Sequence, residues 1–321
     1  MPKPFPDADK YVFKEPFVKQ YSALTDWPEF KRFTLSFLRK SIRVNTLKIS
    51  VKECISRLEE DWVLTPVPWC KEGFFIEHKN GRLDVGNTIE HTLGYYYVQE
   101  AASMLPPLVL NPQAGELVLD VAAAPGSKTS QMAQMMENQG LIVANDVKGD
   151  RLASLGINLQ RTGVSNTVIT LMDGLYFAKS GMLFDKILLD APCSGTGTIR
   201  KSPKTIMMWN PESIKRLVRL QQKLITMAWS ILKPGGTLVY STCSTEPVED
   251  EGVVDFLLKN APDAKVIDID LPLKKGTPVM EWDGQKYNSQ IKKVLRLWPQ
   301  DNDTEGFFVA KIVKASTKCS H

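Results

Sequence analysis

The sequence predicts an α/β fold in which a doubly wound, mostly parallel sheet follows a smaller N-terminal α+β domain. The chain has 321 residues, enough for a large core and two domains. Its 43% hydrophobic and 24% charged residues are typical of globular proteins. From residue 117 onward, short apolar runs alternate with amphipathic stretches, which is the pattern of strands and helices in a parallel sheet.

Residues 1–95 form the predicted N-terminal domain. Aromatic and basic residues alternate there, as in Phe13, Lys14, Phe17 and Lys19. Such side chains can stack on nucleic-acid bases and contact phosphates. Core aromatics separated by solvated lysines give the same pattern, so both interpretations stay open. The elements expected in this domain are strands at 41–47 and 74–76 and a helix at 51–62.

Residues 96–315 form the predicted second domain, and 316–321 form a tail. A first helix at 101–109 should stop at Asn111 and Pro112. Because strands and helices then alternate regularly, the carboxyl ends of the strands should meet at one edge, where open α/β sheets bind ligands. The expected strands lie at 117–122, 141–145, 167–171, 184–189, 237–241, 265–269 and 306–313, and the expected helices at 127–136, 151–160, 211–232 and 248–258.

Cysteine, histidine and charge usage exclude several classes of protein. The cysteines are odd in number and lack a CxxC pair, so neither a disulfide framework nor a zinc site is expected. The histidines are too few and too dispersed for a metal cluster, and we expect no metal. A formal net charge of +4 permits nucleic-acid binding without requiring it. These residues are Cys54, Cys70, Cys193, Cys243 and Cys319, and His78, His91 and His321.

The sequence predicts no contact with a membrane. The first residues lack the apolar core of a secretory signal. No apolar stretch approaches the roughly 20 residues needed to cross a bilayer. We therefore expect a cytoplasmic protein, and we expect it to be a monomer.

The first predicted strand of the sheet ends in a run of small residues that opens into a helix. Small side chains let a ligand lie against the backbone, and the first N–H groups of the helix are free to bind it. A tight turn without a ligand is the alternative. The run is neither a P-loop nor a full GxGxxG, so a phosphate cradle is not predicted. It consists of Ala122, Ala123, Ala124, Pro125, Gly126, Ser127 and Lys128.

Two aspartates follow the next two predicted strands. Asp146 lies about 20 residues past the small-residue run, where an acidic side chain accepts hydrogen bonds from ribose hydroxyls. Its alternative role is to cap the helix that carries Arg151. Asp173 could meet an adenine amino group or cap a turn. After the small-residue run, Asp146 favours an adenosine-type cofactor.

Two later strands each end near a cysteine that is followed by small residues. Asp190 and Cys193 are separated by Ala-Pro on one sharp turn, and Cys243 follows the next apolar strand. We expect these two thiols and one carboxylate to form a reaction centre at the sheet edge. A thiolate is a nucleophile, although buried cysteines commonly act as small hydrophobes. Arg200 follows in a loop with two lysines. These cations could bind an anionic polymer, or they could form a solvated surface.

These motifs together resemble the Sun-type family of RNA cytosine-C5 methyltransferases, which use S-adenosylmethionine. The likeness covers roughly residues 40–313, and two cysteine motifs in this order are specific to the family. Ser127 stands where many members have glycine. The resemblance implies a Rossmann-like methyltransferase sheet. The matching pieces are 122–129, Asp146 with Arg151, Asp173, 190–195 and 241–244, supported by 43–46, 97–104, 232–236 and 304–308.

The resemblance also implies roles for the residues of the reaction centre. Cys243 would add to C6 of cytosine, which makes C5 able to attack a sulfonium methyl group. Asp190 would hydrogen-bond the N3 or amino edge of the base, and Cys193 would assist release of the product. Because DNA cytosine-C5 methyltransferases use the cysteine of a Pro-Cys motif, Cys193 remains the rival nucleophile.

The resemblance further implies where the cofactor and the substrate bind. S-adenosylmethionine would rest on 122–128, with its ribose on Asp146, its adenine near Asp173, and Asp190 at its reacting end. Lys128 and Arg151 would support cofactor or substrate. The RNA would be tRNA, with rRNA as the alternative, and residues 1–95 would bind its backbone. A relative that binds RNA without catalysis and a thiol-redox protein are the other classes considered.

Overall fold

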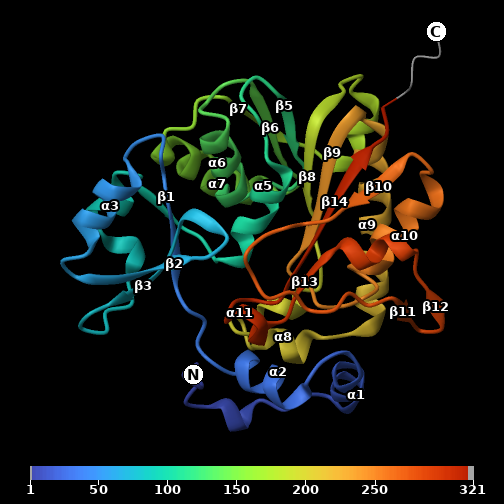
Figure 1. The fold of residues 1–321 in the computed structure, drawn as a ribbon, viewed down its shortest axis with the longest axis horizontal. Helices are drawn as coiled ribbons and strands as arrows, with labels where there is room; N and C mark the ends of the chain where they lie inside the picture. The colour runs from blue at the N-terminus through green and yellow to red at the C-terminus, as the bar shows by residue number, and fades with distance from the viewer. Residues whose placement is uncertain (1, 317–321) are drawn as a thin grey trace.

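The computed structural model describes residues 2–316 (Figure 1). Within these residues the chain forms a central eight-stranded sheet, a four-stranded N-terminal sheet and a short hairpin. The predicted α/β class with a smaller N-terminal domain is confirmed. Cys319, His321 and all but the first residue of the predicted tail lie outside the described residues.

Five parallel strands form the middle of the central sheet, and each strand expected from residue 117 onward is present. The chain order reverses between β5 and β8, so the carboxyl ends of these two strands mark the switch point where ligands bind in such sheets. The strand β14 continues the sheet antiparallel to β9, and β10 and β13 pair with β14. In spatial order the parallel strands are β7 (Thr167–Leu171), β6 (Leu141–Asp146), β5 (Leu117–Asp120), β8 (Phe184–Asp190) and β9 (Leu232–Thr242). They are followed by β14 (Phe307–Lys314) and then β10 (Ala264–Ile267), and β13 (Leu295–Leu297) also pairs with β14.

Helices cover both faces of the central sheet (Figure 1). On one face α9 and α10 bury apolar residues against Ile187 and Leu189 of β8. On the other face α5 and α6 pack against Leu188. Because the later part of β8 is buried on both faces, Ile187, Leu188 and Leu189 form a continuous apolar run rather than an alternating pattern. The helices of this domain are α5 (Leu105–Leu110), α6 (Ser127–Met135), α7 (Gly149–Thr162), α8 (Lys204–Met208), α9 (Pro211–Ser230), α10 (Glu251–Asn260) and α11 (Pro299–Asn302).

The helix expected at 101–109 is shorter than predicted. A 3-10 turn, η3 (Ala102–Met104), precedes α5, which begins only at Leu105. The prolines at 106 and 107 explain this, because proline is tolerated in the first turn of a helix and not in its interior. Asn111 ends the helix in the left-handed region with φ 50°, as its position in the sequence predicted.

The N-terminal sheet is antiparallel and is covered by α3. The helix expected at 51–62 ends at Leu58, and Trp62 begins β2, a strand that the sequence did not reveal because it contains Pro66. The strand β4 lies beyond residue 95 and pairs with β1 of this sheet. The domain boundary at residue 95 stays a prediction. The bounds are β1 (Ser41–Val44), α3 (Val51–Leu58), β2 (Trp62–Val67), β3 (Cys70–His78), α4 (Ile89–Thr92) and β4 (Tyr96–Val98).

The first two helices lie apart from the N-terminal sheet. The helices α1 (Glu15–Leu24) and α2 (Trp27–Thr34) lie beside α8 in Figure 1 and share a core with Trp209 and Trp298. Their rings of Phe17, Tyr21 and Phe30 are buried, and the first two stack with centroids 4.0 Å apart. These aromatics are therefore core residues and are not available for stacking on bases.

Two side chains, one in β1 and one directly after it, fix the N-terminal sheet to helices of the central domain. Arg43 is buried and donates from Nε to Gln99 Oε1 and from Nη2 to Ser130 Oγ, both at 2.8 Å. Asn45 donates from Nδ2 to the carbonyl oxygen of Thr162 at 2.7 Å. Since α6 carries Ser130 and α7 carries Thr162, the N-terminal sheet has a fixed position relative to the loops that precede these helices.

Candidate active site

The two cysteines and Asp190 meet at the carboxyl ends of β8 and β9. Asp190 lies opposite Ser241 in the parallel register of these strands, so the residues that follow each strand are neighbours. The sulfur atoms of Cys193 and Cys243 are 3.4 Å apart, within hydrogen-bond reach, and both residues are half-buried. The structure thus brings together the three residues expected at the reaction centre.

Asp190 is held by one hydroxyl group and one cation. Its Oδ1 accepts a hydrogen bond from Ser241 Oγ at 2.7 Å, and its Oδ2 pairs with Lys128 Nζ at 2.7 Å. Burial by itself would lower the pKa of Lys128, but Asp190 and then Cys243 outweigh it and raise that pKa above its usual value. Lys128 therefore stays cationic, and it connects the small-residue loop to the reaction centre.

The two thiols have different surroundings. The hydrogen bond with Cys243, burial and the nearby Glu249 together raise the pKa of Cys193 well above its usual value. Either sulfur can be the donor in the hydrogen bond between them, and the raised pKa favours the protonated form of Cys193. Because the thiolate is the nucleophilic form of cysteine, this arrangement favours Cys243 over Cys193 as the nucleophile.

The small-residue loop, residues 122–128, runs from just after β5 into the first turn of α6. Gly126 adopts φ +102°, and a Cβ atom there would lie 3.0 Å from Leu155 Cδ1, so glycine suits this position for both conformation and space. The backbone N–H of Ala123 donates to the carbonyl oxygen of Asn145 at 2.7 Å. The loop is therefore fixed beside the end of β6 as well as the end of β5.

Asp146 and Arg151 both contact this loop. The carboxylate of Asp146 is buried and accepts from the backbone N–H of Ala124 at 3.3 Å. Arg151 lies 3.3 Å from the same carboxylate and donates to the carbonyl oxygen of Ala124. Asp146 does not cap α7, whose N-cap is Lys148. The structure thus brings Asp146, Arg151 and the loop together, as expected for a ligand site.

Asp173 caps a turn, which is one of the two roles predicted for it. Its Oδ1 accepts from the backbone N–H of Leu175 at 3.0 Å and caps the 3-10 helix η4 (Gly174–Lys179). The residue is exposed and follows β7, next to the strand that ends in Asp146. Turn capping is therefore present, and contact with an adenine ring stays a prediction.

Asp120 is a residue of this site that the sequence did not single out. Thr129 Oγ1 donates to its Oδ2 at 2.7 Å, while its buried Oδ1 has no hydrogen-bond partner in the described structure. Burial raises the pKa of this carboxyl group to about 7. An unpaired buried acceptor beside the small-residue loop fits a ligand with an N–H donor. The sequence signal that could have identified Asp120 is its position as the last residue of β5, at the edge of the sheet where ligands bind.

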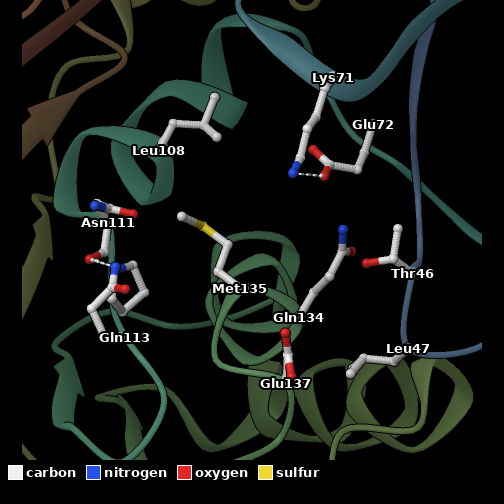
Figure 2. Close-up of a pocket in the computed structure, with 11 residues that line it drawn as sticks. Thr46, Leu47, Lys71, Glu72, Leu108, Asn111, Gln113, Gln134, Met135 and Glu137 are labelled. Carbon is white, nitrogen blue, oxygen red and sulfur yellow. Dashed lines mark hydrogen bonds and ion pairs between the residues drawn. The ribbon is translucent and has the colours of Figure 1, made fainter.

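A pocket of about 650 Å³ lies away from the reaction centre (Figure 2). Lys71 and Glu72 line it from β3, Thr46 lines it from the turn after β1, and Met135 lines it from the last turn of α6. Lys128 is in the first turn of the same helix, so the pocket and the reaction centre lie at opposite ends of α6. The pocket is therefore separate from the site built around the cysteines.

Glu100 and Glu305 form a carboxylate pair near the same edge of the sheet. The backbone N–H of Glu305 donates to Glu100 Oε1 at 3.2 Å. Burial and the neighbouring Glu100 raise the pKa of Glu305 to about 8. The pair therefore retains a proton at neutral pH that an unfolded chain would lose.

This raised pKa predicts that stability falls as pH rises. The folded pKa of Glu305, about 8, lies above the ordinary value of 4.5, so its stabilising contribution is complete below pH 4.5 and is lost as pH rises through 8. Urea unfolding between pH 5 and pH 8.5 should show a slope of up to about 1.4 kcal/mol per pH unit from this group. Glu305→Gln should flatten that slope, and an equal slope in both proteins would contradict the assignment.

Family models match both parts of the chain. Residues 107–313 match the model described as 16S rRNA methyltransferase RsmB/F, and residues 13–101 match the N-terminal domain of 16S rRNA methyltransferase RsmF. The tRNA (cytosine(49)-C(5))-methyltransferase of Pyrococcus abyssi is 51% identical over 298 residues, covering 92% of this chain and 95% of that protein. Ribosomal RNA small subunit methyltransferase F of Escherichia coli is 45% identical over 306 residues, covering 91% of this chain and 62% of its own length.

Solved structures agree with these matches. A methyltransferase homolog protein from Pyrococcus horikoshii superposes with a TM-score of 0.86 at 38% identity, covering 97% of this chain and 99% of that one. NSun6 from Pyrococcus horikoshii, solved with SFG, superposes with a TM-score of 0.83 at 25% identity, covering 95% and 99%. The resemblance to Sun-type enzymes is confirmed.

Two further observations concern metals and membranes. Within residues 2–316, no three side chains of histidine, cysteine, aspartate or glutamate are grouped so that they could hold a metal ion. In the same part of the chain, every helix is too short or too polar to span a bilayer.

Proposed function

The chain belongs to the RsmB/F family of methyltransferases, and we propose that it transfers a methyl group from S-adenosylmethionine to C5 of cytosine in tRNA. The observation that carries this proposal is the pair of half-buried thiols 3.4 Å apart beside Asp190. A nucleophile, a proton-carrying neighbour and a carboxylate are what a covalent attack on a pyrimidine ring requires.

Each residue of the reaction centre has a separate role in the proposed reaction. Cys243 would add through its sulfur to C6, and the ring electrons would move toward C5. C5 would then take the methyl group as the sulfur–methyl bond of the sulfonium breaks, and a neutral thioether would be the leaving group. Asp190 hydrogen-bonds the N3 or amino edge of the base and is itself held by Ser241 and Lys128. The C5 proton would then pass to solvent water, its bond electrons would re-form the C5=C6 double bond, and the C6–S bond would break so that the Cys243 sulfur leaves. Cys193 would assist this release through its hydrogen bond to the departing sulfur. The target base must leave its stack to reach the thiol.

The cofactor would be held by residues from the ends of β5, β6 and β7. The small-residue loop would lie against it, Asp146 would accept from its ribose, and Asp173 would lie near its adenine. Asp120 offers an unpaired oxygen for its amino group. When bound, S-adenosylmethionine supplies an electrophilic methyl group. NSun6, which superposes with this chain, was solved with SFG, an analogue of this cofactor.

Replacing Gly126 by alanine tests this cofactor site. The substitution places a side chain at φ +102° and a Cβ atom 3.0 Å from Leu155, so it should lower the free energy of unfolding by about 1–2 kcal/mol and weaken S-adenosylmethionine binding. Gly81→Ala is the matched control, because φ there is +74° and nothing lies within 4 Å. Equal cofactor affinity of both variants by calorimetry would contradict the site.

tRNA is favoured as the substrate over rRNA. The tRNA enzyme of Pyrococcus abyssi is matched over 95% of its length, whereas the chain spans 62% of the Escherichia coli rRNA enzyme. rRNA is the second candidate because both matching family models describe 16S rRNA enzymes. We further propose that residues 1–95 bind the RNA backbone, through exposed cations such as Lys19, Lys31 and Lys71, and that the enzyme acts as a cytoplasmic monomer.

The test is methyl transfer to defined RNAs. Purified protein and labelled S-adenosylmethionine would be incubated with tRNA transcripts, 16S rRNA and DNA, and bisulfite sequencing would locate the modified base. We expect label in tRNA, and position 49, named for the relative, is the first to examine. Label in rRNA alone would select the second candidate. A protein that binds RNA and labels no nucleic acid would be an inactive relative.

A further inference from the structure

Glu249 is a buried carboxylate that contacts both cysteine segments and has no part in the reaction described above. The residue is completely buried in the segment between β9 and α10. Its Oε1 accepts from the backbone N–H of Ser194 at 3.0 Å, and Ser194 Oγ also donates to this carboxylate. Its Oε2 accepts from Ser244 Oγ at 2.7 Å. Ser194 directly follows Cys193, and Ser244 directly follows Cys243.

Gln221 of α9 completes this arrangement. Its Nε2 donates to Glu249 Oε1 at 3.0 Å and to the carbonyl oxygen of Pro192 at 2.9 Å, so it fixes the residue before Cys193 while Glu249 fixes the residue after it. The donors to the Glu249 carboxylate are a backbone amide, two hydroxyls and a side-chain amide, all neutral. Arg296 instead pairs with the next two acidic residues, Asp250 and Glu251.

Charges lie unequally around the two sulfur atoms. The Glu249 carboxylate accepts two hydrogen bonds from Ser194, next to Cys193, but one from Ser244, next to Cys243. It contributes to the raised pKa of Cys193, while Lys128 from α6 interacts with Cys243. Asp190 from β8 also faces this region, but its charge is paired with Lys128. Tyr240 from β9 donates its hydroxyl to the backbone carbonyl oxygen of Glu249 at 2.6 Å and stays neutral, because burial raises its pKa well above the usual value.

We propose that Glu249 is a positioning residue that joins the two cysteine segments and keeps the shared proton on Cys193, so that Cys243 carries the thiolate. A fixed anion next to Cys193 disfavours a second negative charge there, and Lys128 stabilises one on Cys243. The chemical difference between two otherwise similar cysteines would thus be set by a residue that touches neither substrate nor cofactor. This inference deepens the proposed function, on which its link to methylation rests.

The test measures the pH dependence of thiol alkylation directly, without RNA or cofactor. In the Cys243→Ser protein, the pH midpoint of Cys193 alkylation by iodoacetamide should fall by about one unit when Glu249→Gln is added. Glu249→Asp keeps the charge and should restore most of the high midpoint. Glu246→Gln is the matched control, since Glu246 is a buried acid of the same segment that bonds to Tyr21 and Trp209 instead. An unchanged midpoint in a folded Glu249→Gln protein would overturn the inference.

A second measurement needs no variant of Glu249. In the protein with both cysteines, peptide mass spectrometry after brief alkylation should find Cys243 modified first, and first modification of Cys193 would overturn the inference even if Glu249→Gln does not fold. Methylation assays separate the two proposals. If the midpoint shifts but no RNA is methylated, the proposed function fails and the inference stands. If RNA is methylated but the midpoint is unmoved, the reverse holds.

Discussion

Replacing Cys193 by alanine is expected to trap a covalent complex between the protein and its RNA. Cys243 can still add to the base and C5 can still be methylated, but release of the sulfur loses the neighbouring thiol 3.4 Å away. We expect turnover to fall by about 10²–10⁴-fold, the usual contribution of a proton-transfer group. Denaturing gel electrophoresis should show a band of the combined mass of protein and RNA after incubation with S-adenosylmethionine.

Two controls decide what such a band means. The double variant Cys193→Ala with Cys243→Ala should form no complex, because the attacking sulfur is absent. Cys54→Ala removes a buried cysteine of the N-terminal core and should form no complex while methylation continues. A band in the double variant, or wild-type turnover in Cys193→Ala, would show that the roles of the two cysteines are assigned wrongly.

The positions of the strands in the chain and the place of the reaction centre could be predicted because both depend on local patterns. Apolar runs such as 187–189 are buried on both faces of the sheet, and such runs distinguish buried parallel strands from amphipathic ones. Once two such strands are parallel neighbours, the residues that follow them must meet. Asp190, Cys193 and Cys243 therefore converge for a reason that is already contained in their spacing from the strands.

Contacts between distant segments could not be predicted in the same way. Arg200 was expected to contact an anionic polymer or solvent, yet its side chain is buried, where it donates to the carbonyl oxygens of Phe37 and Thr304 and pairs with Asp303. A buried arginine with partners from two ends of the chain has the same sequence signature as an exposed one. The pairing of Lys128 with Asp190 has no local signal either, because 62 residues separate them.

Partners of this kind also explain why Asp120 and Glu249 were not selected from the sequence. The importance of Asp120 lies in an oxygen that no neighbour occupies, which only a full set of contacts can reveal. Glu249 belongs to a run of acidic residues that is typical of a solvated surface, whereas its carboxylate accepts hydrogen bonds from the loop after β8, from α9 and from the segment after β9. An acidic residue that the sequence suggests is solvated can therefore be buried, where it needs hydrogen-bond donors from the protein.

Replacing Cys243 by alanine is expected to abolish methylation, by about 10³-fold or more, because no group remains to add to C6. Cofactor affinity should stay near that of the unchanged protein, since the small-residue loop, Asp146 and Lys128 remain in place. Single-turnover assays with labelled S-adenosylmethionine would measure the rate, and calorimetry the affinity. The same loss in Cys243→Ser would show that a hydroxyl of similar size cannot replace the thiolate. Substantial methylation by either variant would make Cys193, despite its raised pKa, the attacking group.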